Sequence, residues 1–371
     1  MSEYQYYEFL AVDHELDDDQ QAELRALSTR ADITATRFTN EYHWGDFGGN
    51  PMTMMERYFD AHLYFANWGT HSLMIKLPEQ FLDLDTAQAY CPTDSVSAWR
   101  HDSHVILSLC SDDEEGGGWD ETDETRLSEL IPIRADLAAG DHRALYLGWL
   151  VAAQTELDED ELEPPVPPGL NRLTRSLRAL AEFLRIDDDL LTVAAQASGR
   201  PRDDGLAEFV KGLPQQEKDA LLVRSVTGDP HVTAEVRRRF RRRNAAAPAA
   251  GTRTAGELLE AASARRTERE GVATARAAAE ALLRGQTRAE ARELRLEALA
   301  ADEENAWRKV AALIENKRPA DYDNAVVLLA DLKAVSARTG ETATFAERFE
   351  GLRTEHRRKP SLLERFERSG L

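Results

Sequence analysis

The sequence predicts an α+β protein, with an acidic N-terminal α+β domain that has a mostly antiparallel sheet, followed by a helical C-terminal half. Up to residue 110, short segments with a period of two alternate with short helical segments, which favours an α+β layer. After residue 168 the apolar residues recur at intervals of three and four, as in amphipathic helices. The charge follows the same division. Residues 1–163 hold 9 Lys and Arg against 35 Asp and Glu, and the rest holds 37 against 32.

The first domain is expected to span residues 1–160. Strict alternation of side-chain character over residues 33–44 predicts a strand. Asn50 and Pro51 are the cap and first-position residues of a helix, and Gly69 is the residue that ends one, so a helix is expected between them. The same arguments place strands at 4–12, 33–44, 71–77, 95–99 and 104–109, and helices at 20–27, 52–67, 81–90 and 126–153.

A charge run followed by four prolines in residues 156–168 predicts a domain boundary. Proline-separated apolar segments then favour a small bundle of short helices, because proline cannot continue a helix. An Ala-, Arg- and Glu-rich stretch has high helix propensity, and a final pair of amphipathic segments predicts a helical hairpin. The expected parts are a bundle at 168–243, a linker at 244–253, a long charged helix at 254–317 and a hairpin at 320–371.

Composition restricts the class of protein. The first twenty residues carry acids and no Lys or Arg, which argues against a signal peptide. Apolar runs without charge are shorter than the roughly 20 residues that cross a bilayer, so no membrane partner is expected. The two cysteines, Cys91 and Cys110, predict neither a disulfide framework nor a zinc pattern. We therefore expect a cytoplasmic protein without a cofactor.

Residues 36–78 are rich in aromatic side chains and contain three histidines. His43, Asp46, His62 and His71 are the candidate catalytic residues, although no pair has a recognised metal-ligand spacing and no metal site is predicted. The expected helix places His62 on its apolar face, where a hydrogen-bonded core histidine is the commoner case. If these residues serve an enzyme, they should converge on a pocket with Trp44 and Trp68.

An arginine cluster is the second candidate site and the candidate binding site. It consists of Arg237, Arg238, Arg239, Phe240, Arg241, Arg242 and Arg243. Guanidinium groups in this density suit nucleic-acid phosphate, a membrane surface, or the acidic first domain. Cations at the C-terminal end of a helix are also favoured by the helix dipole alone. An internal or protein partner is the favoured interpretation.

Two resemblances accompany these patterns. The phrases YEFLAVD, TRFTNEYHWGDF, MERYFDAHLYFANWGT and DDEEGGGWDE together resemble an uncharacterised family of bacterial proteins, over most of the chain. The tail from KRPADYDNAVVLLADLKAV to RRKPSLLERFERSGL is similar to the tails of bacterial proteins with a SWIM zinc finger. That finger needs three cysteines and a histidine, and this chain has two cysteines. The resemblance therefore implies only a shared helical tail.

The favoured hypothesis is a non-catalytic interaction or scaffold protein that docks a protein partner through its helical C-terminal half. The alternatives are a nucleic-acid-associated protein that uses Arg237–Arg243, and an enzyme of unknown chemistry with a pocket around Trp44, Asp46 and His62. Leucines and Trp307 keep a near-heptad spacing in the 254–317 helix, so a homo-oligomer could form through it. Packing of this helix on its own bundle is the favoured alternative.

Overall fold

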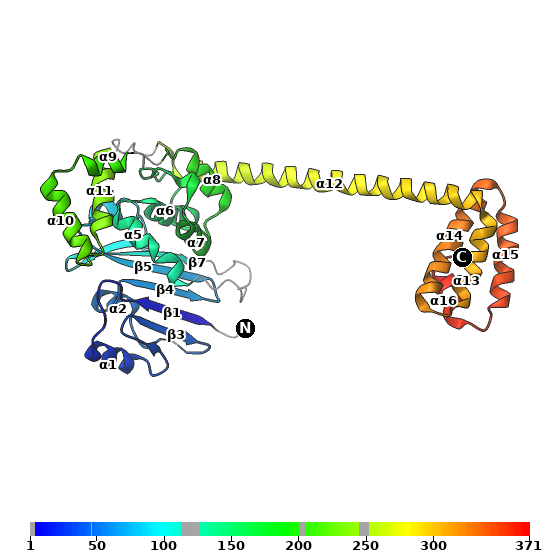
Figure 1. Ribbon diagram of the computed structural model, residues 1–371, viewed down its shortest axis with the longest axis horizontal. Helices are drawn as coiled ribbons and strands as arrows, with labels where there is room; N and C mark the ends of the chain where they lie inside the picture. Colours follow the sequence, from blue (N-terminus) through cyan, green and yellow to red (C-terminus); the bar gives the residue numbers. More distant parts are fainter. Residues whose placement is uncertain (1–3, 46, 113–125, 201–204, 245–251) are drawn as a thin grey trace. The chain divides into compact units, whose positions relative to one another are not determined.

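The computed structural model confirms the α+β class (Figure 1). It describes residues 4–45, 47–112, 126–200, 205–244 and 252–371. The chain forms two compact units, Met1–Glu268 and Arg269–Leu371, and the division falls inside one helix. Among the helices of the described residues, none has an apolar run long enough to cross a bilayer.

The first unit is built on a seven-stranded sheet in the order β2-β3-β1-β4-β5-β7-β6. Every pair of neighbours is antiparallel, so the predicted sheet type is confirmed. Each strand alternates its side chains between the two faces, and both faces are covered. The strands are β1 (Gln5–Leu10), β2 (Asp32–Ile33), β3 (Arg37–Tyr42), β4 (Ala61–Ala66), β5 (Thr70–Pro78), β6 (Val96–His101) and β7 (His104–Asp112).

The expected helix over residues 52–67 is wrong in its second half. Helix α2 (Pro51–Arg57) begins at the predicted cap, where the Asn50 side chain accepts a hydrogen bond from the Thr53 amide. It ends seven residues later, and residues 61–66 form β4 between β1 and β5. The segment AHLYFA suits a helix or a strand by pattern alone. Pairing on both sides decides it, because a central strand buries both of its faces.

Two hydrophobic cores lie on the two faces of the sheet. Helix α1 (Asp18–Leu27) and α2 pack over the core around Phe9 and Phe38. The other face is covered by helices that pack against Leu63, Leu73 and Leu107 (Figure 1). The short helix after β5 is α3 (Leu84–Gln88). The helices that follow the sheet in the chain are α4 (Leu127–Leu130), α5 (Pro132–Ala138), α6 (Arg143–Thr155), η1 (Leu170–Arg172), α7 (Arg175–Phe183) and α8 (Asp188–Gln196).

The predicted boundary at residues 156–168 lies inside the first unit. Glu163 is buried and accepts a hydrogen bond from Tyr146, and Arg253 forms an ion pair with it at 2.7 Å. Leu162 forms a β-bridge with Thr254. The prolines therefore belong to a packed strap, whose buried carboxylate, Glu163, is neutralised by Arg253, two residues before the long helix.

The expected long helix 254–317 is two helices. Helix α12 (Ala255–Ala301) ends at Asp302, whose side chain caps α13 (Glu303–Glu315) by accepting from the Asn305 amide at 3.3 Å. The expected C-terminal hairpin is confirmed as α14 (Pro319–Thr339) and α15 (Thr342–Glu355), and α16 (Pro360–Arg368) follows. Helices α13 to α16 share one core around Leu329, Phe345 and Phe366.

Candidate partner-docking groove

The three described histidines of the first candidate site lie in three different environments. The His43 side chain is exposed after β3 and lies against the ring of Tyr4, with centroids 5.3 Å apart. His62 is buried on the sheet face of Phe9, on which its ring is stacked at 3.8 Å. His71 lies on β5 and pairs with Phe65 of β4. Its side chain therefore lies on the opposite face of the sheet from that of His62. Asp46 lies outside the described residues.

His62 is held as a neutral ring. Its Nδ1 is 3.0 Å from the backbone carbonyl oxygen of Glu8. Burial lowers the pKa of His62 to about 3, although the bond to Glu8 opposes this shift. A ring enclosed by aromatic side chains and bonded to one strand carbonyl has no room for a substrate atom. Its place in the structure is that of a core histidine.

His71 contacts the helical layer. Its Nδ1 is 2.6 Å from the carbonyl oxygen of Phe183, and its ring is stacked on that of Phe183. Trp44 is 69% exposed, so no pocket encloses it. Within the described parts of the chain, no three His, Cys, Asp or Glu side chains are placed to share a metal ion.

The arginine cluster lies on α11 (Val232–Asn244), and four of its guanidinium groups contact side chains or backbone of the first unit. Arg241 donates to the Ala139 carbonyl at 3.2 Å and pairs with Asp141 at 3.4 Å. Arg238 lies over the ring of Phe81, Arg243 lies over the ring of Phe209, and Arg239 bonds to Glu217 and Glu235. Phe240 is buried in the middle of the cluster.

Asp141 is the acidic anchor for this helix. Burial by itself would raise the pKa of Asp141, but hydrogen bonds and charge from Arg143, with the charge of Arg241, hold it below its ordinary value. The carboxylate therefore stays ionised and accepts from both arginines. Gly140 has a positive φ of 76° and leaves room for Arg238, which a side chain there would contact at 3.4 Å. Helix α11 is thus fixed to the body of the unit by one of its faces.

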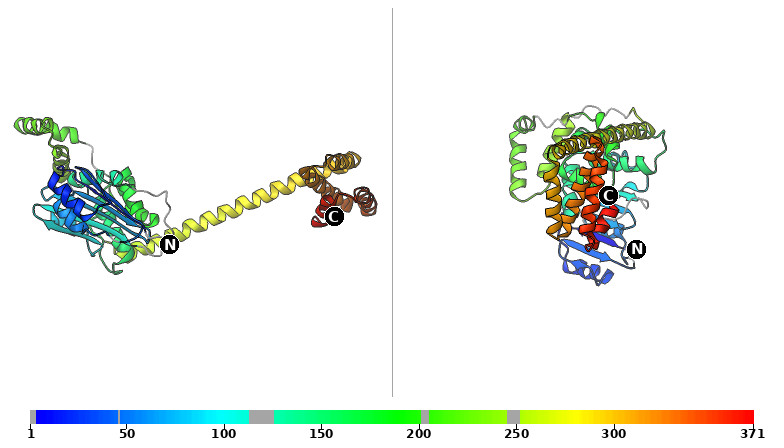
Figure 2. Two further views of the ribbon diagram at one scale, coloured as in Figure 1. Left: turned by 90° about the horizontal axis from the view of Figure 1, so that it is seen from below. Right: turned by 90° about the vertical axis from the view of Figure 1, so that its right-hand side faces the viewer.

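Beside α11, two further helices bury almost nothing. They are α9 (Leu206–Lys211) and α10 (Gln215–Val226), and neither contains a buried residue. Leu222 is 65% exposed and Val210 is 38% exposed. Figure 2 shows these green helices at the edge of the first unit. Apolar helix faces of this kind normally pack against another part of the protein or against a partner, because burial of apolar area is the main stabilising term for a short helix.

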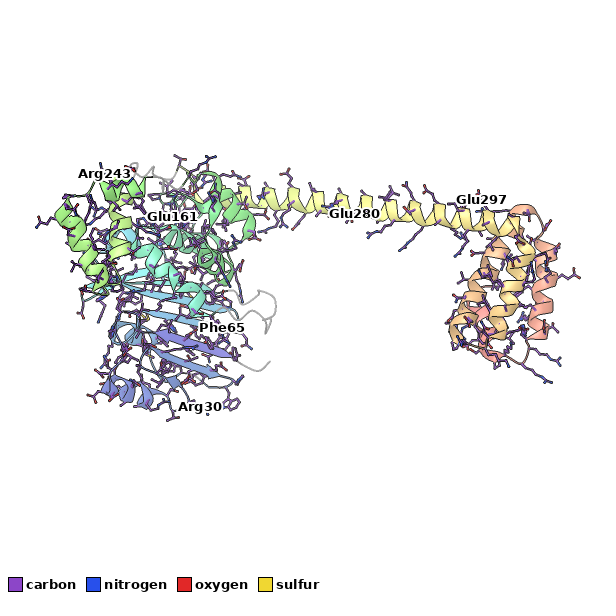
Figure 3. All side chains as sticks on the ribbon, viewed as in Figure 1. Arg30, Phe65, Glu161, Arg243, Glu280 and Glu297 are labelled. Carbon is purple, nitrogen blue, oxygen red and sulfur yellow. The ribbon has the colours of Figure 1, made fainter. Side chains whose placement is uncertain are left out.

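The three helices enclose an open groove of about 400 Å³. Its floor and walls are mainly aliphatic, and Lys218 and Arg237 contribute the positive charges of the lining. Figure 3 labels Arg243 on the same helix as Arg237. The lining residues are Leu206, Val210, Leu213, Lys218, Leu221, Leu222, Ser225, Val232, Thr233, Val236 and Arg237.

Local sequence explains why the groove stays open. Pro214 and Pro230 precede α10 and α11, and a proline there ends the preceding helix and limits each segment to a few turns. Gly205 has a positive φ of 109° and starts α9. Arg224 bonds to Asp229 and to Glu235, both at 2.8 Å, and so ties α10 to α11 by polar contacts. These ion pairs join the end of α10 to the start of α11, and the aliphatic face between the two helices remains exposed.

Sequence reasoning identified the arginines but missed the aliphatic lining. Leu221 and Leu222 lie in the segment 168–243, for which the sequence predicts a small bundle with its apolar residues inside. The signal that could have singled them out is charge. Residues 205–244 carry 9 Lys and Arg against 5 Asp and Glu, a net of +4 in a chain of −21.

Comparisons of this chain with protein-family models, with curated proteins and with solved structures found no match. The resemblances noted in the sequence therefore stay predictions.

Proposed function

We propose that this protein is a non-catalytic interaction protein, which binds an acidic amphipathic helix of a partner protein in the groove between α9, α10 and α11. The observation that carries the proposal is the aliphatic groove, of which two helices, α9 and α10, bury no side chain of their own. A helix that lays its apolar face into such a groove is a common mode of peptide recognition. The favoured occupant is helical because the groove runs between helices and offers side chains rather than a strand edge.

Charge selects the class of partner. Lys218 and Arg237 line the groove, and the surrounding segment is positive although the chain is strongly negative. A helix with Asp and Glu beside its apolar face would meet opposite charges here, whereas a basic helix would be repelled. Binding should therefore weaken as the salt concentration rises, because exposed charges are screened.

The arrangement of the arginines argues against nucleic acid as the main partner. Arg238, Arg239, Arg241 and Arg243 all contact groups of their own chain. Arg237 and Arg242 are the exposed members that could meet phosphate without giving up such a contact. Nucleic-acid binders commonly neutralise several phosphates at once, so two free guanidinium groups would supply little affinity.

The test is site-specific photo-crosslinking in the native cell. A photoreactive amino acid replaces Leu222 on the groove, and the matched control carries it at Leu282, which is equally exposed on α12. We expect a protein adduct specific to position 222, and peptide sequencing should place the crosslink in an acidic amphipathic segment. Adducts to nucleic acid, or the same adducts from both positions, would contradict the proposal.

A binding measurement then tests the chemistry. A fluorescent peptide of the crosslinked segment should bind the full chain, and Leu222→Asp should weaken binding by roughly tenfold or more, since it places a carboxylate on the apolar contact. Arg237→Glu should reduce both the affinity and its salt dependence. The control Leu282→Asp should leave both unchanged. All three positions are exposed, so the fold should survive each substitution.

A further inference from the structure

A stripe of exposed apolar residues follows the second part of helix α12. Residues 269–295 are all exposed, and within them Val272, Leu283 and Leu294 are each about two-thirds exposed. They are spaced eleven residues apart. Eleven residues make three turns of an α-helix to within about 20°, so the three side chains lie almost in line along the helix.

This stripe faces away from the helices of its own unit. Helix α12 contacts α14 through two ion pairs, Arg295 with Asp331 at 2.5 Å and Glu293 with Arg338 at 2.6 Å. Leu296, next to Arg295, is buried. Leu296 lies two positions after Leu294, which is about 200° around the helix axis. The side of α12 that packs in the second unit is thus roughly opposite the stripe.

Four charged residues beside the stripe are arranged symmetrically about Leu283. Arg276 lies seven residues before it and Glu290 seven residues after it, and Arg269 and Glu297 lie fourteen residues before and after. Seven residues make two turns to within about 20°, so these side chains share the face of the stripe. Figure 3 labels Glu280 and Glu297 along this helix. Of these four residues, the two before Leu283 are cations and the two after it are anions.

We infer that a second copy of this chain covers the stripe, with the two α12 helices antiparallel and related by a two-fold axis at Leu283. Such a pairing sets Leu283 against its own copy and Val272 against Leu294 of the partner copy. It also sets Arg276 against Glu290 and Arg269 against Glu297, twice each by symmetry. A parallel pairing in register would set each of these charges against itself, which is destabilising.

The interface is small, so the dimer is expected to be weak and dependent on concentration. Arg276 already pairs with Glu280 of its own helix at 3.1 Å, but both side chains are exposed, so this bond costs little to exchange. The inference does not depend on the groove of the first unit and goes beyond the function proposed above.

Sedimentation of the full chain over a range of concentrations tests the dimer. Leu283→Lys should abolish association, because it places two like charges on the two-fold axis. Leu282→Lys is the matched control, since Leu282 is 66% exposed but lies about 100° off the stripe. A chain that stays monomeric throughout, or equal loss of the dimer in both variants, would overturn the inference.

Charge reversal tests the pairing. Arg276→Glu and Glu290→Arg should each weaken association by about three- to tenfold, and the double variant should restore it. If the double variant is weaker than either single one, Arg276 and Glu290 do not face each other.

Cysteine crosslinking tests the direction. Under mild oxidation, Leu283→Cys should form a dimer disulfide, and a mixture of Val272→Cys and Leu294→Cys chains should form a heterodimer. Val272→Cys alone should not crosslink to itself. Efficient self-crosslinking through position 272 would show a parallel pairing and overturn the proposal.

Discussion

At the scale of single residues, burial decides what a titratable side chain can do. Lys76 and Asp60 are both buried, and their charged atoms are 3.7 Å apart. The Asp60 carboxylate also accepts from the backbone amides of Val12 and Asp13, and Arg134 pairs with Asp13. Each charge in this network has several partners, which is the condition for keeping charges inside a protein. The sequence offered no pattern for it, because the residues come from four separate segments.

His62 allows a prediction for pH. Its pKa is about 3 in the folded chain, below the ordinary value of 6.5, because burial disfavours the charged ring. Between these two pH values the unfolded chain binds a proton that the folded chain does not. The free energy of unfolding therefore falls as the pH falls through this range, by at most about 1.4 kcal/mol per pH unit from this group.

Replacing the ring removes that dependence. The variant His62→Leu should lose less stability than the wild type between pH 6.5 and 4, as measured by urea unfolding of the first unit. His43→Leu, a substitution at an exposed ring, is the control. Parallel stability curves for wild type and His62→Leu would show that the ring takes up its proton without unfolding.

At the scale of elements, close approach of backbones fixes where helices start. The amide of Gly256, in the first turn of α12, donates to the Glu159 carbonyl at 3.0 Å. A Cβ at this position would lie 2.9 Å from the same carbonyl oxygen. Gly271 in the same helix has open space around it. Two glycines of one helix therefore have opposite roles.

This difference predicts opposite effects of the same substitution. Gly256→Ala should lower the free energy of unfolding of the first unit by about 1–3 kcal/mol, because the strap at residues 156–168 must move. Gly271→Ala should raise helix stability by up to about 1 kcal/mol through propensity alone. Thermal unfolding followed by circular dichroism measures both. If both substitutions stabilise the protein, the strap at residues 156–168 can move to admit the methyl group at little cost in free energy.

Elements also show where sequence patterns reach their limit. The predicted cap at Asn50 is confirmed, because its side chain acts on an amide only three residues away. Residues 58–67 were misassigned to a helix, because the partners of β4 lie more than fifty residues before it in β1 and across a turn in β5. Local hydrogen bonds can be read from neighbouring residues, whereas strand pairing depends on segments that meet only in the fold.

At the scale of the whole molecule, the cores of the two units share no residue. Calorimetry should therefore resolve two unfolding transitions. Leu329 is fully buried in the second unit, and Leu329→Ala should lower only one transition, by roughly 10 °C or more for a loss of 2–5 kcal/mol. Gly256→Ala should lower only the other. A single transition shifted by both variants would show that the units unfold together.

The sequence by itself determined the α+β class, the antiparallel sheet, the helical C-terminal hairpin and the uneven charge. These properties follow from periodicity, capping and composition, which act over a few residues or over the average of many. Only the tertiary structure decided that the histidines lie apart, that the proline-rich strap lies inside the first unit, and that aliphatic side chains of α9 and α10 remain exposed. Exposure depends on which distant segments pack against a helix, and no local pattern contains that information.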